Sequence, residues 1–261
     1  MIQLIPLFSG SSGNAAYVGT AQAGLLIDAG VSCRSILQGL EASGISPQAV
    51  QGVLVTHDHS DHIKGLRVLC KKLRIPVYAA CETLDMLIQL DAVEWGTDLL
   101  EISGPNDLAG MEVTPFDTPH DAAHSIGFRI DTGERTIGYA TDLGTVTPGV
   151  WEMLQGCDLV LLEANYEPAL LRVSSYPYFL KQRVASHTGH LSNEVSARCI
   201  ADLARTGTAR FVLAHLSREN NTPDIAAQAV REVLSLEGYQ EGRDFTLEVA
   251  RRLEPTPAIV F

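Results

Sequence analysis

The chain has 261 residues, of which 46% are apolar, and it is long enough to bury one large core or two small ones. Its formal charge of −12, from 19 basic and 31 acidic residues, opposes non-specific wrapping of nucleic acid, although a local basic groove stays possible. The five scattered cysteines form no CxxC pair and suggest neither a disulfide framework nor a thiolate zinc site. We expect one domain, residues 1–261, in a reducing cytoplasm.

The N-terminal residues 1–8 are apolar but lack a basic region, and the Gly/Ser-rich residues 9–14 follow directly. This pattern is more typical of a strand entering a loop than of a signal peptide. No segment approaches the roughly 20 apolar residues that span a bilayer, so we expect a soluble protein with no membrane partner. The loop could hold a phosphate on its backbone N–H groups, although a turn between two strands has the same composition.

Short apolar runs of strand length follow, and each ends at a possible metal ligand. The runs cover residues 24–27, 53–56, 111–119, 136–141 and 211–214. The ligands behind them, in the same order, are Asp28, His57, His120, Asp142 and His215. If the runs are strands, these side chains lie in loops at one edge of the sheets, where a rigid scaffold presents chemistry.

Helical periodicity appears between the predicted strands. Residues 225–234 follow Thr222-Pro223, an N-cap and a first helical position, and residues 195–203 follow Ser192 in the same way. A helix is also predicted over residues 63–73, and residues 255–261 are predicted to be a closing edge or a tail. Strands mixed with helices favour an α/β fold, a four-layer αββα sandwich. A doubly wound Rossmann-type sheet is the competitor, but no GxGxxG motif follows a strand.

The histidines are the most informative residues of the chain. All eight fall into four short segments, namely His57/His59/His62, His120/His124, His187/His190 and His215. In the first segment, alternate residues of an extended loop place two imidazoles on one side, and Asp61 follows at the next turn. Imidazole and carboxylate suit Zn, Mn or Fe, and two such sets can hold two ions about 3.5–4 Å apart. A His-rich surface loop is the alternative, which the ligands in other segments disfavour.

The first histidine segment, His57-x-His59-x-Asp61-His62, resembles the HxHxDH signature of the metallo-β-lactamase superfamily. The other motifs of that family are matched in order by Asp28, His120, Asp142 and His215. The resemblance implies a hydrolase with two divalent transition-metal ions, Zn or Mn. It assigns one ion to His57, His59 and His120, and the other to Asp61, His62 and His215. Asp142 would bridge the ions, and Asp28 would orient a ligand imidazole.

Three residues near these motifs compete for roles. His124 follows His120 by four residues and could replace it, but residues 127–129 have the family's spacing from His120. Asp58 is expected to be a solvated acid or one that contacts a ligand residue. His187 is expected to have no role at the metals.

The distal motifs resemble those of the nuclease and phosphodiesterase branch: GHLSN at 189–193, HLSRENN at 215–221, and Glu163. In that branch a histidine outside the metal shell, paired with a carboxylate, helps to protonate the leaving oxygen, a general-acid contribution on the order of 10²–10⁴-fold. His190 with Glu163 would form this pair, although a histidine at a helix start has the same pattern. Together with Asp61, these two are the predicted catalytic residues.

The whole chain resembles the small bacterial YycJ-type proteins, which are regarded as 5′-to-3′ DNA exonucleases. The resemblance implies a metal-bridging hydroxide as nucleophile. Too few residues separate Asp142 from His215 for the inserted domain of larger nucleases, and the long arm of transfer-RNA processing enzymes is not evident, so DNA is favoured over folded RNA. The alternatives are a thioester or β-lactam hydrolase, glyoxalase II-like or β-lactamase, and a metal-stabilised binding module without activity.

Two sets of side chains are candidates for substrate contact. The cations available for phosphate are Lys64, Arg67, Lys71, Lys72, Lys181, Arg183 and Arg218. The aromatic residues between Glu163 and Lys181 could lie over the site and stack bases, and these are Tyr166, Tyr176, Tyr178 and Phe179.

Overall fold

The computed structural model describes residues 1–260, and the chain forms two compact units. The first unit contains residues 1–115 and 122–126 and the C-terminal segment from Ala250, and the second contains residues 116–121 and 127–249. Neither unit is one continuous stretch of chain, and the prediction of a single domain stays a prediction. Within residues 1–260 no helix is both long and apolar enough to cross a bilayer.

The first unit is built on a seven-stranded sheet of order β14-β1-β2-β3-β4-β5-β6. Its strands are β1 (Gln3–Phe8), β2 (Ala15–Gly19), β3 (Gly24–Ile27), β4 (Val50–Leu54), β5 (Val77–Ala79), β6 (Leu99–Glu101) and β14 (Ile259–Val260). The strands from β3 to β6 are parallel, so their carboxyl ends meet at one edge. β14 pairs with β1 and closes the sheet, as predicted for the tail, whose last residue lies outside the described residues.

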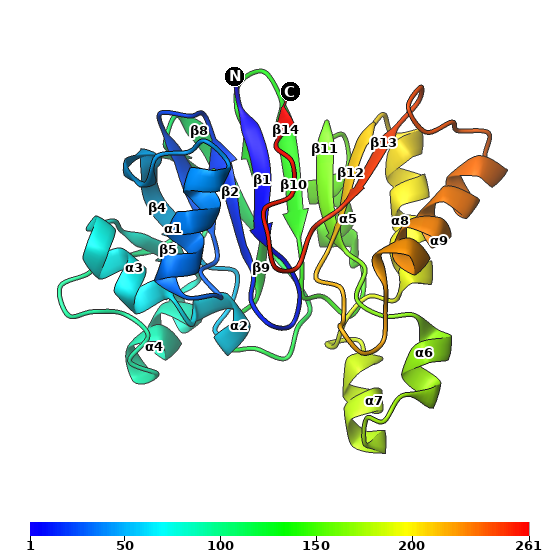
Figure 1. Ribbon diagram of the computed structural model, residues 1–261, viewed down its shortest axis with the longest axis horizontal. Coiled ribbons are helices and arrows are strands. Elements are labelled where there is room, and N and C mark those ends of the chain that lie inside the picture. Colours follow the sequence, from blue (N-terminus) through cyan, green and yellow to red (C-terminus); the bar gives the residue numbers. More distant parts are fainter. Residues whose placement is uncertain (261) are drawn as a thin grey trace. The chain divides into compact units, whose positions relative to one another are not determined.

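Helices cover this sheet over a core of aliphatic side chains (Figure 1). They are α1 (Cys33–Ala42), η1 (Pro47–Ala49), α2 (Ser60–Ile63), α3 (Leu66–Leu73) and α4 (Cys81–Gln89). The core between α1, α3 and the sheet includes Ile5, Leu26, Ile36, Leu40, Leu66 and Leu69. The antiparallel pair β7 (Asn106–Leu108) and β8 (Met111–Asp117) follows in the chain.

The helix predicted over residues 63–73 is confirmed over residues 66–73, which form α3, but its predicted start is wrong, because Lys64 and Gly65 form a turn between α2 and α3. The Gly65 N–H donates to the carbonyl oxygen of Ala29 at 2.7 Å. A Cβ atom at this position would lie 2.0 Å from the carbonyl oxygen of Val31, so only glycine permits the close approach. The break therefore joins the histidine segment to the loop that follows Asp28.

The strands of the second unit have the order β13-β12-β11-β10-β9. They are β9 (Ile126–Asp131), β10 (Thr136–Ala140), β11 (Leu159–Glu163), β12 (Arg210–Ala214) and β13 (Thr246–Val249). The strands from β10 to β13 are parallel, and the register pairs Ala140 with Leu162 and Glu163 with Ala214. The residues that follow β10 and β12 therefore lie at the same sheet edge as Glu163.

The helices of the second unit are α5 (Pro148–Leu154), α6 (Pro168–Val173), α7 (Tyr178–Val184), α8 (Asn193–Arg205) and α9 (Pro223–Leu236). The two predicted helix starts are confirmed, since Ser192 accepts a bond from the N–H of Val195 and Thr222 accepts one from Ile225. α8 and α9 lie side by side (Figure 1), over a core that includes Leu162, Ile200, Leu203, Phe211, Leu213 and Val230.

Candidate metal centre

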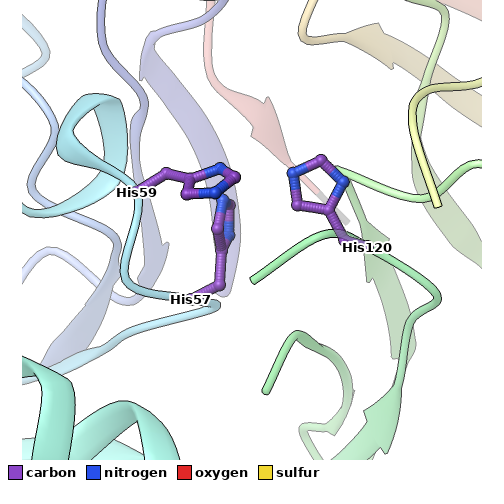
Figure 2. Close-up of side chains that lie close together, drawn as sticks. All are labelled: His57, His59 and His120. Carbon is purple, nitrogen blue, oxygen red and sulfur yellow. The ribbon is translucent and has the colours of Figure 1, made fainter. Parts of the chain in front are cut away.

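The first unit gathers three imidazoles on the segment that follows β4. The ring centroids of His57 and His59 are 4.7 Å apart, and those of His57 and His62 are 4.1 Å apart. His57 and His62 are fully buried, whereas His59 is partly exposed. Figure 2 shows the rings of His57 and His59, and it also labels His120, which belongs to the second unit. Asp61 adds a carboxylate oxygen 3.7 Å from Nε2 of His62.

A buried carboxylate fixes the orientation of two of these rings. Asp28 accepts the N–H of Thr56 at 2.8 Å and its hydroxyl at 2.9 Å, and it contacts Nδ1 of His62 at 2.7 Å. Because the Thr56 hydroxyl donates to Asp28, its oxygen accepts the proton on Nδ1 of His57, which is 3.0 Å away. Both imidazoles then carry their proton on Nδ1, which leaves Nε2 as the ligand atom. Sequence analysis predicted the role of Asp28 but missed Thr56.

The Gly/Ser-rich loop after β1 contacts this cluster through Asn14, which sequence analysis also missed. The Asn14 amide nitrogen lies 3.0 Å from Nε2 of His62, and its backbone N–H donates to the carbonyl oxygen of Asp61. The N–H groups of Gly10 and Gly13 donate within the loop. These three donors are therefore used inside the protein, and the phosphate cradle considered for this loop stays a prediction.

The competing residues of the first unit lie elsewhere. His124 is bound through Nδ1 to Glu82 at 2.8 Å, on a partly exposed surface. Asp58 accepts the N–H of Ala123 at 3.0 Å. Among the described residues, neither side chain belongs to a group whose ligand atoms converge as a metal site requires.

The second unit gathers the remaining predicted residues at the carboxyl ends of its parallel strands. Asp142 follows β10, His215 follows β12, and Nδ1 of His215 lies 2.7 Å from Oδ2 of Asp142. His120, in the loop after β8, donates from Nδ1 to the carbonyl oxygen of Gly189 at 2.9 Å, and its Nε2 lies 3.8 Å from Oδ1 of Asp142. The ligand atoms of Asp142, Glu163, His190 and His215 all lie within 4.8 Å of one another. His187, by contrast, is exposed and outside this cluster.

His190 and Glu163 form the pair that the sequence predicted. Nδ1 of His190 lies 2.7 Å from Oε1 of Glu163, and the second carboxylate oxygen accepts the N–H groups of Leu143 and Leu191. Glu163 is fully buried, so its carboxylate is fixed. Burial alone would lower the pKa of His190, but Glu163 and, secondarily, Asp142 raise it to about 9. The buried carboxylate of Glu163 therefore favours the protonated imidazole.

The donor sets of both units suit transition-metal ions. They consist of imidazole and carboxylate groups, which bind Zn, Mn and Fe. The imidazoles of His57, His62 and His120 each use Nδ1 on an oxygen of the protein, the arrangement that orients metal-binding histidines. The residues present thus fit divalent metal ions of this kind.

Three of the cations considered for phosphate contact are already held by carboxylates. Arg67 binds Asp91 and Glu94, Lys71 also binds Glu94, and Arg183 binds Asp121. A pocket of about 580 Å³ in the first unit is lined by His59, Lys64 and Arg67 together with apolar side chains such as Val68 and Leu90. Of the two basic residues that line this pocket, Arg67 forms ion pairs, and Lys64 forms none with an acidic side chain among residues 1–260.

Comparisons with known proteins agree with these motifs. The model of the Beta-lactamase superfamily domain matches residues 24–216. Exodeoxyribonuclease YycJ of Bacillus anthracis is 34% identical over 253 residues, covering 96% of each chain. Exodeoxyribonuclease WalJ of Streptococcus pneumoniae is 33% identical over 245 residues, covering 92% of this chain and 90% of the relative.

Solved structures show the same fold. Zn(2+)-bound PqqB from Methylobacterium extorquens matches with a TM-score of 0.72 at 18% identity, and the metallo-beta-lactamase fold protein YhfI from Bacillus subtilis matches with 0.72 at 16%. Each match covers 98% of this chain and 99% of the other. The predicted α/β metallo-β-lactamase fold is confirmed, and so is the predicted enzyme class, a hydrolase. The chain belongs to the β-lactamase superfamily.

Proposed function

We propose that the chain is a dinuclear metal-dependent phosphodiester hydrolase, a 5′-to-3′ exonuclease acting on DNA. The observation that carries this proposal is the contact between His190 and the buried Glu163. Hydrolysis of a phosphodiester releases an alkoxide, which is a poor leaving group and requires a proton. Hydrolysis of a thioester releases a thiolate, which is stable without one. A general acid held by a buried carboxylate therefore favours phosphodiester chemistry over the thioester alternative.

His190 would supply that proton from Nε2. Its Nδ1 proton is engaged by Glu163, and the buried carboxylate favours the doubly protonated ring. The leaving sugar oxygen would therefore accept the proton on Nε2. The Glu163 carboxylate keeps this orientation, because two backbone N–H groups donate to its second oxygen.

The metal ligands are assigned by the family pattern and by the contacts within each unit. We assign His57, His59 and His120 to one ion, Asp61, His62 and His215 to the other, and Asp142 to both. Contacts within each unit support this assignment. In the first unit the rings of His57, His59 and His62 lie close together, and in the second unit Asp142 contacts His215. When bound, two Zn or Mn ions would lower the pKa of a water and neutralise charge on the phosphate.

The substrate class is supported by the relatives. Two proteins named exodeoxyribonuclease align with at least 90% of their own length, so the likeness is not limited to the metal motifs. The formal charge of −12 implies that DNA is held by a few local contacts and not by an extended basic surface.

The test is to incubate the metal-loaded protein with end-labelled linear DNA, a covalently closed circle and RNA. We expect degradation of linear DNA alone, with a 5′ label released as mononucleotide from the first turnover and a 3′ label persisting in shortening fragments. Early release of the 3′ label would reverse the direction. Hydrolysis of a glutathione thioester or a β-lactam, with no cleavage of any nucleic acid, would replace the proposal by the alternative.

A further inference from the structure

Helices α6 and α7 form a small lobe with a core of its own. Tyr166, Leu171 and Val184 are buried in that core, and Tyr176 and Leu180 pack against it. The Lys181 ammonium joins the helices by donating to the carbonyl oxygen of Arg172 at 2.8 Å. Figure 1 shows the two helices side by side. Two of the four aromatic side chains considered for base stacking are therefore structural.

The other two aromatic side chains face solvent at the start of α7. Tyr178 is 75% exposed and Phe179 is 72% exposed, and Val173 on α6 is 79% exposed. The Tyr178 hydroxyl accepts a bond from the Gln182 amide at 2.8 Å, which restricts the ring. Adjacent exposed rings on an ordered helix form a surface that ordinary core packing does not require.

The charge around these rings is positive in an otherwise acidic chain. Residues 168–193 contain no aspartate or glutamate, although the whole chain has 31 acidic residues. The segment carries Arg172, Lys181 and Arg183, of which Arg183 is bound to Asp121. A polyanion is complementary to such a segment, whereas in a symmetric dimer built on this face the positive segments of two copies would face each other.

The lobe is fixed to the segment that holds the general acid. The N–H of His190 donates to the carbonyl oxygen of Val184, the last residue of α7, at 2.9 Å. A Cβ atom on Gly189 would lie 2.2 Å from the carbonyl oxygen of Arg183, so only glycine permits this contact. A strand bound on α7 is thereby held at a defined position relative to His190.

We propose that Tyr178 and Phe179 form a stacking site for the unpaired bases of single-stranded nucleic acid, with Arg172 and Lys181 beside its phosphates. The inference deepens the proposed function, on which it rests, by locating where the strand is held. Stacking on aromatic rings tolerates any base, as expected for a degradative enzyme. Duplex DNA offers few unpaired bases and gains little from the site.

The experiment measures fluorescence anisotropy of a labelled phosphorothioate oligodeoxythymidylate, which resists cleavage, with metal-loaded protein. The double variant Y178A/F179A is expected to raise Kd at least about 30-fold, the low end for losing two stacked bases. The matched control W95A removes a 98% exposed ring of the first unit and should leave Kd unchanged. The variant Y178W/F179W should restore binding, and Kd for blunt duplex DNA should change little.

The binding and turnover measurements separate the two proposals. The double variant should hydrolyse bis(p-nitrophenyl) phosphate at the wild-type rate, because that substrate is too small to extend from the metal centre to Tyr178 and Phe179. An unchanged Kd for the oligonucleotide would overturn the stacking site, even if the wild type cleaves DNA. Conversion of a dimer to a monomer by the substitutions, with Kd unchanged, would overturn it in favour of an interface between copies. Failure of the wild type to cleave any phosphodiester would instead refute the proposed function.

Discussion

The Nδ1 atom of His62 lies 2.7 Å from Oδ2 of Asp28, and both side chains are fully buried. Asp28 has a φ of 63°, in the left-handed region that few non-glycine residues adopt. The strained backbone turns the carboxylate toward both Thr56 and His62. The contact therefore links the end of β3 to the histidine segment, and it suits a role in orienting a metal ligand.

We predict that Asp28→Asn lowers the affinity for metal by about 10–100-fold, because the imidazole of His62 loses its charged acceptor. Titration against a chromogenic chelator measures this directly. The control is Asp58→Asn, since Asp58 is partly exposed and accepts only one recorded backbone bond. Equal affinities in the two variants would show that Asp28 does not orient a ligand.

His190→Ala should leave the metal content almost unchanged and lower DNA turnover by about 10²–10⁴-fold, the range of a lost general acid. His215→Ala should lose both metal and activity, because His215 contacts Asp142 directly. Metal analysis and turnover of both variants test this contrast. Loss of an ion from the His190→Ala protein would assign His190 to the metal shell.

The leaving group provides a second test of His190. A nitrophenolate leaves without protonation, so His190→Ala should retain most of its activity toward bis(p-nitrophenyl) phosphate while losing activity toward DNA. Glu163→Gln, which keeps the shape of the side chain, should show the same selectivity to a smaller degree. An equal loss on both substrates would indicate a binding role for the pair.

Removal of metal should abolish activity, and Mn or Zn should restore it. The fully loaded protein should contain up to two ions per chain by mass spectrometry of the metals, since seven candidate ligands occur in family order. One ion or none in a fully active preparation would contradict the dinuclear assignment. Mg alone should restore little, because imidazole-rich sites disfavour it.

The sequence predicted most of what positions the site, because strand ends and helix caps are local signals. Residues 24–27 were predicted as a strand and form β3, and Ser192 and Thr222 cap the helices that they were expected to cap. The predicted pair of His190 and Glu163 is in contact, although they lie in separate segments. That pairing came from the resemblance of the distal motifs to the nuclease and phosphodiesterase branch, and not from strand or helix signals.

Features that depend on contacts between distant segments could not be predicted. Asp and His adopt positive φ more often than most residues, but no local pattern of the sequence singles out Asp28, Asp142 and His215 for it. The helix break at Gly65 arises because its backbone lies close to Val31, a contact that the hydrophobic periodicity of the sequence does not show. Likewise, the aromatic residues 166–179 look alike in sequence, and only packing separates the buried from the exposed rings.

Thermal unfolding is predicted to show one cooperative transition, as expected for the single domain proposed from the sequence. The first unit is completed by the C-terminal segment, which follows the second unit in the chain, and β14 must pair with β1 to close its sheet. Calorimetry should give equal calorimetric and van't Hoff enthalpies, and added metal should raise Tm. Two separated transitions would show that the units are independent domains.

A pair of buried amides is predicted to hold the two distal motifs in place. Nδ2 of Asn221 donates to Oδ1 of Asn193 at 2.8 Å and to the carbonyl oxygen of Ala164 at 2.9 Å, and Nδ2 of Asn193 donates back to Oδ1 of Asn221 at 3.0 Å. Asn165 adds a bond from its amide to the carbonyl oxygen of His215. The segment after β11 is thus bonded on both sides, to the motif of His190 and to that of His215.

Asn221→Ala should therefore lower the free energy of unfolding by about 2–4 kcal/mol, because it leaves buried partners without hydrogen bonds. It should also lower DNA turnover, since both histidine segments lose a support. Urea unfolding measures the first effect. The control is Asn106→Ala, whose amide makes a single recorded bond, to Gly104, and which should change stability by no more than about 0.5 kcal/mol. If Asn221→Ala were as stable as this control, the amide pair would not hold the site, and the positions of His190 and His215 would depend on their own contacts with Glu163 and Asp142.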